Sequence, residues 1–285
     1  MDRRSALLIL FAAALLLSSC AFSGAKKAPE ESPAESTLAD DLEVHFFNAG
    51  KADAILLTTG ESAVLIDAGE KGFGKTILAY LEERSIEKLD YLIVTHFDKD
   101  HVGGAAKVLN SIPVGTVLQN GSPKDSEEYK KYVRALSGAG IEPLTVRERL
   151  SFTLDGVQYT VDPPRRAEYA ADTSNNSSLI VSVQNGENRF LFLGDAQTER
   201  LSEFLDADAA AYDVLKLPHH GKDEPLLSAL LASAKPGYAV ITSSDGEPES
   251  AAVVETLNAA GVQVLLTREG AVTFQSDGET LRLIP

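Results

Sequence analysis

The sequence predicts an α/β domain that is layered as a sandwich of two sheets flanked by helices. Three observations support this fold class. Short apolar runs of strand length alternate with segments whose apolar residues recur at helical spacing. Polar and charged residues follow directly after several of these runs, where loops on a rigid frame usually carry function. The residues from Leu42 to the C-terminus fit one domain that is large enough to bury substantial apolar surface.

Runs of strand length occur along the whole of this domain. In chain order, strands are expected at residues 42–47, 54–58, 62–66, 91–94, 157–161, 179–183, 189–193, 214–217, 238–241, 263–266 and 271–275. Helices are expected where apolar residues share one face of a helix. These faces are formed by Ile77, Leu78 and Leu81, by Tyr129, Tyr132, Val133 and Leu136, and by Val253, Val254 and Leu257.

The strand expected at 91–94 runs into a polar segment with the sequence THFDKDHVGG. Two histidines and two carboxylates lie within six residues there, namely His96, Asp98, Asp100 and His101. Because alternate side chains at a strand end point the same way, His96 and Asp98 can converge on one ion while the other two turn toward a second. Imidazole and carboxylate suit zinc, iron or manganese, and the two glycines let the backbone turn close to the ions. The alternative is an ordinary solvated acidic loop.

Carboxylate and imidazole groups also follow two later apolar runs. The run at 190–193 ends at Gly194 and Asp195, and the run at 214–218 ends at His219 and His220. Four of the five histidines therefore follow strand-like runs. The fifth, His45, lies inside an expected strand, where a structural role is expected.

In this order the segments resemble the metallo-β-lactamase superfamily, and more closely its ComEC-like branch. The resemblance runs from about Leu42 to the C-terminus. It rests on the segment 48–54, the segment 65–69, the His-x-Asp-x-Asp-His loop, Asn176, Gly194 with Asp195, and His219-His220-Gly221. A phosphorylcholine esterase of the superfamily is similar in placing Asp where Asp98 stands. The resemblance implies a four-layer αβ/βα sandwich.

The resemblance also implies a centre of two adjacent divalent ions. Its ligands are expected to be His96, Asp98, Asp100, His101, Asp195 and His220. The first two hold one ion, Asp195 bridges both, and the other three hold the second ion. Zinc is the expected metal, but an oxygen-rich ligand shell leaves manganese open.

Two positions beside these ligands are interpreted from the same resemblance. His220 is preferred to His219 as the ligand because it directly precedes Gly221, as the last ligand does in the family. His219 then faces the substrate. Asn176 falls where many relatives have a further histidine, which leaves the first ion short of a nitrogen ligand and makes Asn176 a candidate substrate contact. The alternative for Asn176 is an ordinary turn residue.

The positions expected to line the substrate pocket depart from the ComEC-like pattern. The glutamine of the opening motif is Lys51, and its second glycine is Ala52. The serine that often follows His-His-Gly is Lys222, and the late Gly-His-Pro carries Glu247 at its centre. Lys51 and Lys222 are candidate contacts for an anionic group, unless they are solvated surface charges.

The expected activity is metal-dependent hydrolysis, with a phosphodiester as the substrate favoured by family analogy. The ions lower the pKa of an attacking water and polarise an ester oxygen. Asp100 and Asp195 orient that nucleophile, and His219 stabilises the transition state or protonates the leaving group. Phosphorylcholine esterase and β-lactam hydrolase activities are the first alternatives. A binding lipoprotein that holds metal without turnover is the second, kept open by the changed pocket positions.

The N-terminus predicts an exported, lipid-anchored protein. Arg3 and Arg4 precede the apolar stretch 6–17, which is too short to span a bilayer but suits a signal peptide of residues 1–19. The sequence LSSC then matches a bacterial lipoprotein cleavage site, so Cys20 is expected to carry membrane lipid on the extracytoplasmic face. An ordinary secretory signal is the alternative. Since Cys20 is the only cysteine, no disulfide can form within the chain.

Residues 20–41 are rich in Ala, Lys, Pro, Glu and Ser, which predicts a flexible tether. The chain carries a net charge of −16; residues 1–19 contribute +1 and residues 20–41 contribute −3, which leaves −14 for the hydrolase domain at 42–285. This acidity opposes broad binding to nucleic acid, although the expected substrate is still anionic, a small molecule or a nucleic acid. No protein partner is inferable from the sequence.

Overall fold

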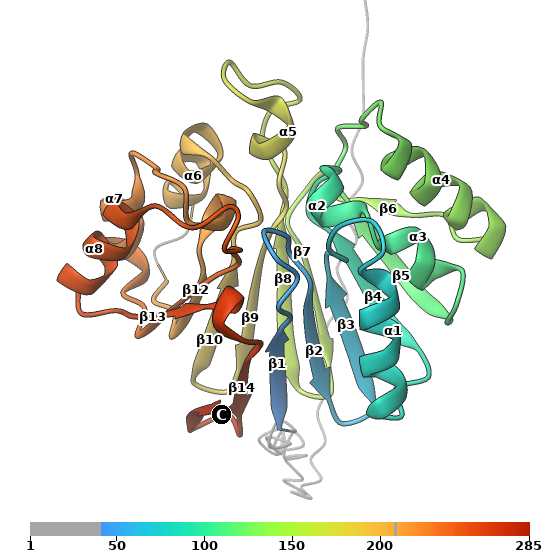
Figure 1. Cartoon of the computed structure of the whole chain (residues 1–285), viewed down its shortest axis with the longest axis horizontal. Helices are drawn as coiled ribbons and strands as arrows, with labels where there is room; N and C mark the ends of the chain where they lie inside the picture. Colours follow the sequence, from blue (N-terminus) through green and yellow to red (C-terminus); the bar gives the residue numbers. More distant parts are fainter. Residues whose placement is uncertain (1–40, 208–209) are drawn as a thin grey trace, which may run out of the picture. The chain divides into compact units, whose positions relative to one another are not determined.

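The computed structural model describes residues 41–207 and 210–285. These residues belong to the compact unit that begins at residue 37. Two sheets lie face to face, with helices on the outer side of each (Figure 1). The expected signal peptide, Cys20 and nearly all of the expected tether lie outside the described residues. None of the helices in the described ranges is long and apolar enough to cross a membrane.

The first sheet has eight strands. Their order is β15 (Leu281–Ile284), β14 (Val272–Ser276), β1 (Leu42–Phe46), β2 (Ile55–Thr59), β3 (Ser62–Ile66), β4 (Leu89–Val94), β5 (Val114–Gln119) and β6 (Leu144–Thr145). Neighbours from β15 to β3 are antiparallel, and neighbours from β3 to β6 are parallel. The loop that follows the carboxyl end of β4 therefore lies at the edge of the sheet, where it can carry functional residues.

The second sheet has seven strands. Their order is β13 (Gln263–Leu266), β12 (Tyr238–Ile241), β11 (Val214–Lys216), β10 (Asn188–Phe192), β9 (Ile180–Asn185), β8 (Val157–Asp162) and β7 (Leu150–Leu154). Neighbours from β10 to β13 are parallel, and those from β7 to β10 are antiparallel. The carboxyl ends of β10 and β11 lie at one edge, so the loops that follow them are neighbours.

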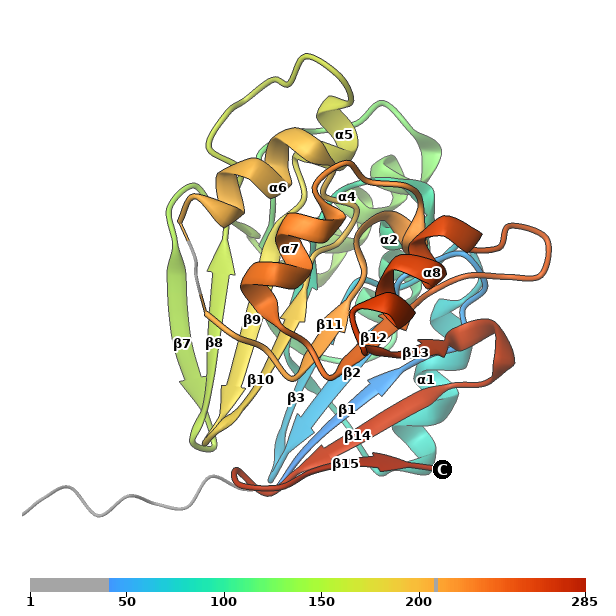
Figure 2. The same cartoon turned by 90° about the vertical axis from the view of Figure 1, so that its left-hand side faces the viewer.

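Helices cover the outer faces of both sheets. The first sheet packs against α1 (Gly74–Glu83), α2 (Lys99–Val102), α3 (Ala105–Leu109) and α4 (Glu127–Ala139). The second packs against α6 (Thr198–Leu205), α7 (Leu227–Ala234) and α8 (Ala251–Ala259), as Figure 2 shows. One apolar core lies between the sheets and one beneath each helical layer. The four-layer sandwich predicted from the sequence is thereby confirmed.

Several elements of the fold were not predicted from the sequence. Strands β5, β6, β7 and β15 were not expected, nor were helices α2, α5 (Thr173–Asn176), α6 and α7. Gly115 interrupts the apolar run of β5, and a Cβ there would lie 2.9 Å from the carbonyl oxygen of Asp90 on the neighbouring strand. Glycine is therefore required at position 115, because the two backbones approach closely there. The same glycine weakens the strand pattern in the sequence.

Candidate metal centre

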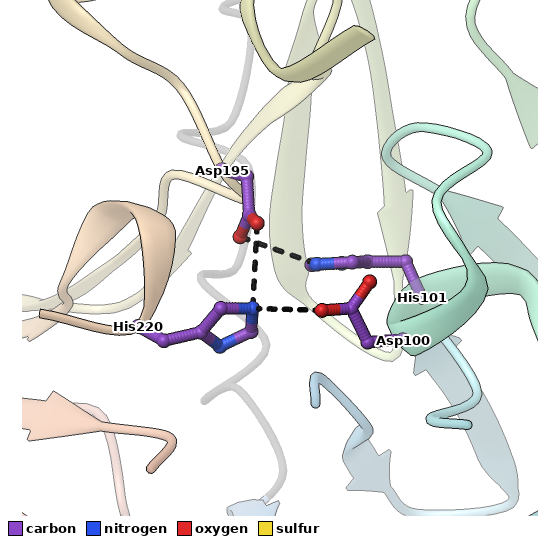
Figure 3. Close-up of side chains that lie close together, drawn as sticks. All are labelled: Asp100, His101, Asp195 and His220. Carbon is purple, nitrogen blue, oxygen red and sulfur yellow. Dashed lines mark ion pairs between the residues drawn. The ribbon is translucent and has the colours of Figure 1, made fainter. Parts of the chain in front are cut away.

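Four side chains from both halves of the sandwich meet where β4, β10 and β11 end. Asp100 and His101 lie on α2, Asp195 lies between β10 and α6, and His220 lies in the turn Pro218–Gly221 after β11. Nε2 of His101 is 3.2 Å from Oδ1 of Asp195, and Nε2 of His220 is 3.3 Å from Oδ2. Nε2 of His220 is also 3.6 Å from Oδ2 of Asp100 (Figure 3). These four residues are called the tetrad below.

The tetrad fits a divalent ion. One ligand atom from each residue lies within 4.8 Å of all the others, and all four residues are buried. Nε2 of His101, Nε2 of His220 and Oδ1 of Asp195 have no hydrogen-bond partner. Buried polar atoms without partners are costly, and an ion at their centre would satisfy all of them. Two imidazoles and two carboxylates suit zinc or manganese.

Hydrogen bonds behind the two histidines hold Nε2 ready to coordinate. Thr242 donates its hydroxyl to Asp53 at 2.6 Å and lies 2.9 Å from Nδ1 of His220. Because its proton goes to Asp53, Thr242 accepts the Nδ1 proton, which leaves the Nε2 lone pair free. Asp67 lies 2.7 Å from Nδ1 of His101 and fixes that ring in the same way. No role was assigned to Asp53, Asp67 or Thr242 from the sequence, although the first two stand in segments that carry the family resemblance.

Lys216 is a second group that the sequence analysis missed. Its side chain is fully buried on β11, forms an ion pair with Asp53, and donates to the Gly194 carbonyl at 3.1 Å. Its ammonium nitrogen is 3.9 Å from Oδ1 of Asp195. Burial opposes the charge on Asp53, but Lys216 and the two histidines beside it outweigh burial and lower its pKa. A lysine inside the otherwise apolar run of β11 was the available signal.

Electrostatics in the tetrad favour a bound cation. Burial opposes the charge of Asp195, but His220 and His101 hold the pKa of that carboxyl well below its usual range. Burial also opposes a charge on His101, yet Asp195 and Asp67 raise its pKa well above the ordinary value. The carboxylates therefore attract positive charge into this buried site. Because protons and a metal compete for the same lone pairs, ion binding releases protons.

The backbone separates His219 from His220. Their φ angles are +49° and +56°, and Gly221 follows at +71°. Left-handed backbone at a residue other than glycine costs about 1–3 kcal/mol and is found at functional sites. A Cβ at Gly221 would lie 2.8 Å from Cγ2 of Ile241, so glycine is needed there on two grounds. As a result, His220 is buried in the tetrad, while His219 lines the cleft outside it.

His219 is uncharged at neutral pH. Burial lowers its pKa to about 4, and Lys222 adds to the effect of burial against the opposing influence of Asp195. Nδ1 of His219 lies 3.2 Å from the Gln197 amide nitrogen, and Nε2 lies 3.4 Å from the Asn175 amide nitrogen. A neutral imidazole in this position can donate one hydrogen bond and accept another, but it carries no charge.

His96 and Asp98, the ligands expected for the first ion, lie beside the tetrad. Nε2 of His96 is buried without a hydrogen bond, 3.9 Å from Oδ1 of Asp98 and 4.0 Å from Oδ2 of Asp195. The Asp98 carboxylate is bonded to the Lys124 ammonium and the Ser174 hydroxyl. Burial opposes its charge, but His96, Lys124 and Ser174 lower its pKa.

Asn176 joins the loop before β9 to helix α6. Its side-chain oxygen accepts hydrogen bonds from the backbone nitrogens of Gln197 at 3.2 Å and Arg200 at 3.1 Å. These nitrogens begin α6 and have no partner within the helix, so Asn176 serves as their acceptor. Its buried amide nitrogen has no hydrogen bond. The predicted contact between Asn176 and substrate could therefore be made only by that nitrogen.

A cleft of about 510 Å³ opens onto the tetrad. Four lysines line it, namely Lys51, Lys99, Lys124 and Lys222. Five carboxylates, those of Asp98, Asp100, Glu128, Asp172 and Asp195, and the ring of His219 line it as well. Lys51 donates to Oδ2 of Asp100 at 3.2 Å. Burial opposes the charge of Lys51, but Asp100 outweighs burial and raises its pKa. An adjoining hollow of about 280 Å³ shares His219 and Lys222, so the two lysines predicted to contact substrate both border the site.

Comparisons with known proteins identify the family. The family model described as the metallo-beta-lactamase superfamily matches residues 48–243, which include the whole tetrad. Recombination protein 2 of Haemophilus influenzae is 26% identical over 211 residues, which are 72% of this chain and 25% of that protein. Competence protein ComA of Neisseria gonorrhoeae is 26% identical over 247 residues, which are 84% of this chain and 33% of that protein. The chain thus spans about a quarter to a third of these relatives.

A solved structure agrees with this assignment at the level of the fold. The metallo-beta-lactamase fold protein YhfI from Bacillus subtilis superposes with a TM-score of 0.55 at 13% identity, covering 83% of this chain and 100% of that one. The competence protein among the curated relatives agrees with the ComEC-like resemblance of the motifs. The chain therefore belongs to the metallo-beta-lactamase superfamily.

Proposed function

We propose that this protein is a metal-dependent hydrolase that cleaves a phosphodiester. One observation carries the proposal: a buried ligand tetrad suited to a divalent ion opens into a cleft where four lysines lie among carboxylates, and one of these lysines, Lys222, is exposed beside His219. An ion in the tetrad supplies Lewis-acid chemistry, activating water and polarising the ester oxygen. A phosphodiester has both a polarisable oxygen and an anionic charge, so it matches the ion and the lysines together.

The protein's own residues hold and orient the reactants. Asp195 and Asp100 are kept as carboxylates by the histidines around them, so each can accept a hydrogen bond from the attacking water. His219 lines the cleft in neutral form and can donate a hydrogen bond to an oxygen that gains negative charge in the transition state. A pKa of about 4 argues against His219 as the proton donor at neutral pH, which leaves stabilisation as its proposed role.

Charge supports the proposed substrate class. Lys51 already neutralises Asp100, whereas Lys222 is exposed beside His219 and forms no salt bridge with a carboxylate of the described residues. The net charge of −14 from residue 42 onward opposes contact with a long duplex, which favours a small phosphodiester or a strand end. The names of the two curated relatives, a recombination protein and a competence protein, agree with a nucleic-acid phosphodiester. Zinc is the proposed ion, with manganese the alternative.

Hydrolysis of bis-nitrophenyl phosphate by the metal-loaded protein tests this proposal. We expect turnover that is lost on chelation and restored by zinc or manganese. Lys222→Gln should raise KM about fivefold with kcat nearly unchanged, since a unit charge pair at 4 Å in water contributes about 1 kcal/mol. Lys75→Gln, an exposed lysine on α1, is the matched control and should leave KM as it is. Cleavage of a lactam instead, or no turnover by metal-loaded protein, would support the alternative functions.

We further propose that the protein is anchored at the extracytoplasmic face of a bacterial membrane through lipid on Cys20. The proposal rests on the N-terminal sequence. In cells supplied with labelled fatty acid, the wild type should take up label and Cys20→Ser should not, because serine has no thiol to acylate. Ser23→Ala keeps the cysteine and should be labelled normally. Label in the Cys20→Ser protein would exclude this anchor.

A further inference from the structure

A lysine side chain supplies a positive charge at Asp98, in the half of the centre expected to hold the first ion. Lys124, in the loop between β5 and α4, places its ammonium on Oδ1 of Asp98 and 3.2 Å from the Ser174 hydroxyl. Ser174, on α5 (Thr173–Asn176), donates to the same carboxylate oxygen. Three separate segments thus converge on the atom that the two-ion pattern assigns to the first metal.

While Lys124 occupies Asp98, the other groups at this position are too few to hold an ion. The oxygen of Asn176, at the place of the missing histidine, is occupied by the first backbone nitrogens of α6. His96 and Asp98 join no group of three or more ligands within 4.8 Å of one another in residues 41–207 and 210–285. The tetrad meets that criterion with four residues. The first position therefore offers His96, a shared Asp195 and a carboxylate already bonded to an ammonium.

We propose that the ammonium of Lys124 takes the place of the first ion, so that the chain binds one divalent ion in the tetrad and none at Asp98. The ammonium has three donors, and two of them are used by Asp98 and Ser174. Lys124 also lines the cleft, so its third donor is available to an anionic oxygen of the substrate. This inference rests on the proposed function in one respect, namely that the tetrad binds an ion.

Metal stoichiometry tests the inference without any measurement of turnover. Wild-type protein loaded with Mn²⁺ and dialysed should retain about one ion per chain, and Lys124→Met should retain about two, the number in two-metal sites. The second ion should bind Lys124→Met about 10–100-fold more tightly than wild type, the range over which groups bonded to ligands alter metal affinity. Electron paramagnetic resonance should show isolated Mn²⁺ in the wild type and coupled ions, about 3.5–4 Å apart, in Lys124→Met.

Three further variants complete the test. Lys99→Met removes another lysine of the same cleft, one paired with Glu70 at 3.7 Å, and should still bind one ion. Lys124→Arg keeps the cation and should also bind one. Lys124→Met with Asp98→Ala should return from two ions to one, because the released carboxylate is then missing.

The possible failures are distinguishable. Two coupled ions in the wild type would overturn the role of Lys124 and leave the proposed hydrolase intact. One ion in both the wild type and Lys124→Met would also overturn it, because Lys124 would not be what excludes the first ion. No ion in the wild type after reconstitution would overturn the tetrad itself, and with it the proposed function.

Discussion

His220→Ala should lose metal and activity together, whereas His219→Ala should keep its metal and lose about 10²-fold in kcat. The two residues are adjacent in sequence, but the left-handed turn directs only His220 into the tetrad. Removal of a ligand should weaken metal binding by more than the roughly 10–100-fold expected for the groups that support ligands. Loss of one transition-state donor accounts for the expected fall in kcat of His219→Ala.

Metal content by elemental analysis and the pH dependence of kcat check this prediction. With a pKa of about 4, His219 is uncharged both at pH 6 and at pH 8. His219→Ala should therefore lower kcat by a similar factor at both pH values and leave the shape of the profile unchanged. Metal lost only from His219→Ala would exchange the two roles, and a profile flattened by that substitution would make His219 an acid or base instead.

Lys216→Met should destabilise the fold by about 3–5 kcal/mol. The substitution leaves Asp53 buried without its ion-pair partner, and removal of one partner of a buried ion pair typically has this effect. Such a loss is a large part of the 5–15 kcal/mol that usually separates folded from unfolded protein. Urea unfolding in the presence of a chelator measures it without a contribution from bound metal.

Two variants separate this effect from a general loss of lysine. Lys75→Met, on the exposed face of α1, should change stability by less than about 0.5 kcal/mol. Lys216→Met combined with Asp53→Asn should recover much of the lost stability, because the amide carries no charge to compensate. A single Lys216→Met variant as stable as the wild type would mean that the Asp53 charge is compensated in another way.

The sequence predicted the fold and the tetrad for a common reason. Ligands at strand ends are marked by an apolar run followed by a polar residue, as at Asp195 and His220. Gly103 and Gly104 lie next to the ligands, as predicted, but glycine is needed at these positions for a different reason. Both have helical φ and ψ, and a Cβ at Gly104 would collide with the Ala68 carbonyl, so they permit close packing rather than a turn.

Other parts of the site could not be predicted because they depend on contacts between distant segments. Lys124 lies in a loop without a motif, 26 residues after its partner Asp98. Asn176 reads equally well as a turn residue, and only the fold reveals that it supports the start of α6. Lys216 was predictable in principle, since a charge within a buried strand requires a partner. The metal, the substrate and the anchor at Cys20 stay predictions.

The tetrad takes Asp100 and His101 from the side of the first sheet, and Asp195 and His220 from the side of the second. An ion bound by all four residues would therefore link the two halves of the sandwich. By linkage, at a free concentration of one hundred times its dissociation constant it adds about 2.7 kcal/mol to the folded state. If the tetrad binds its ion as proposed, metal supply would therefore alter the stability of the folded protein as well as the proposed activity.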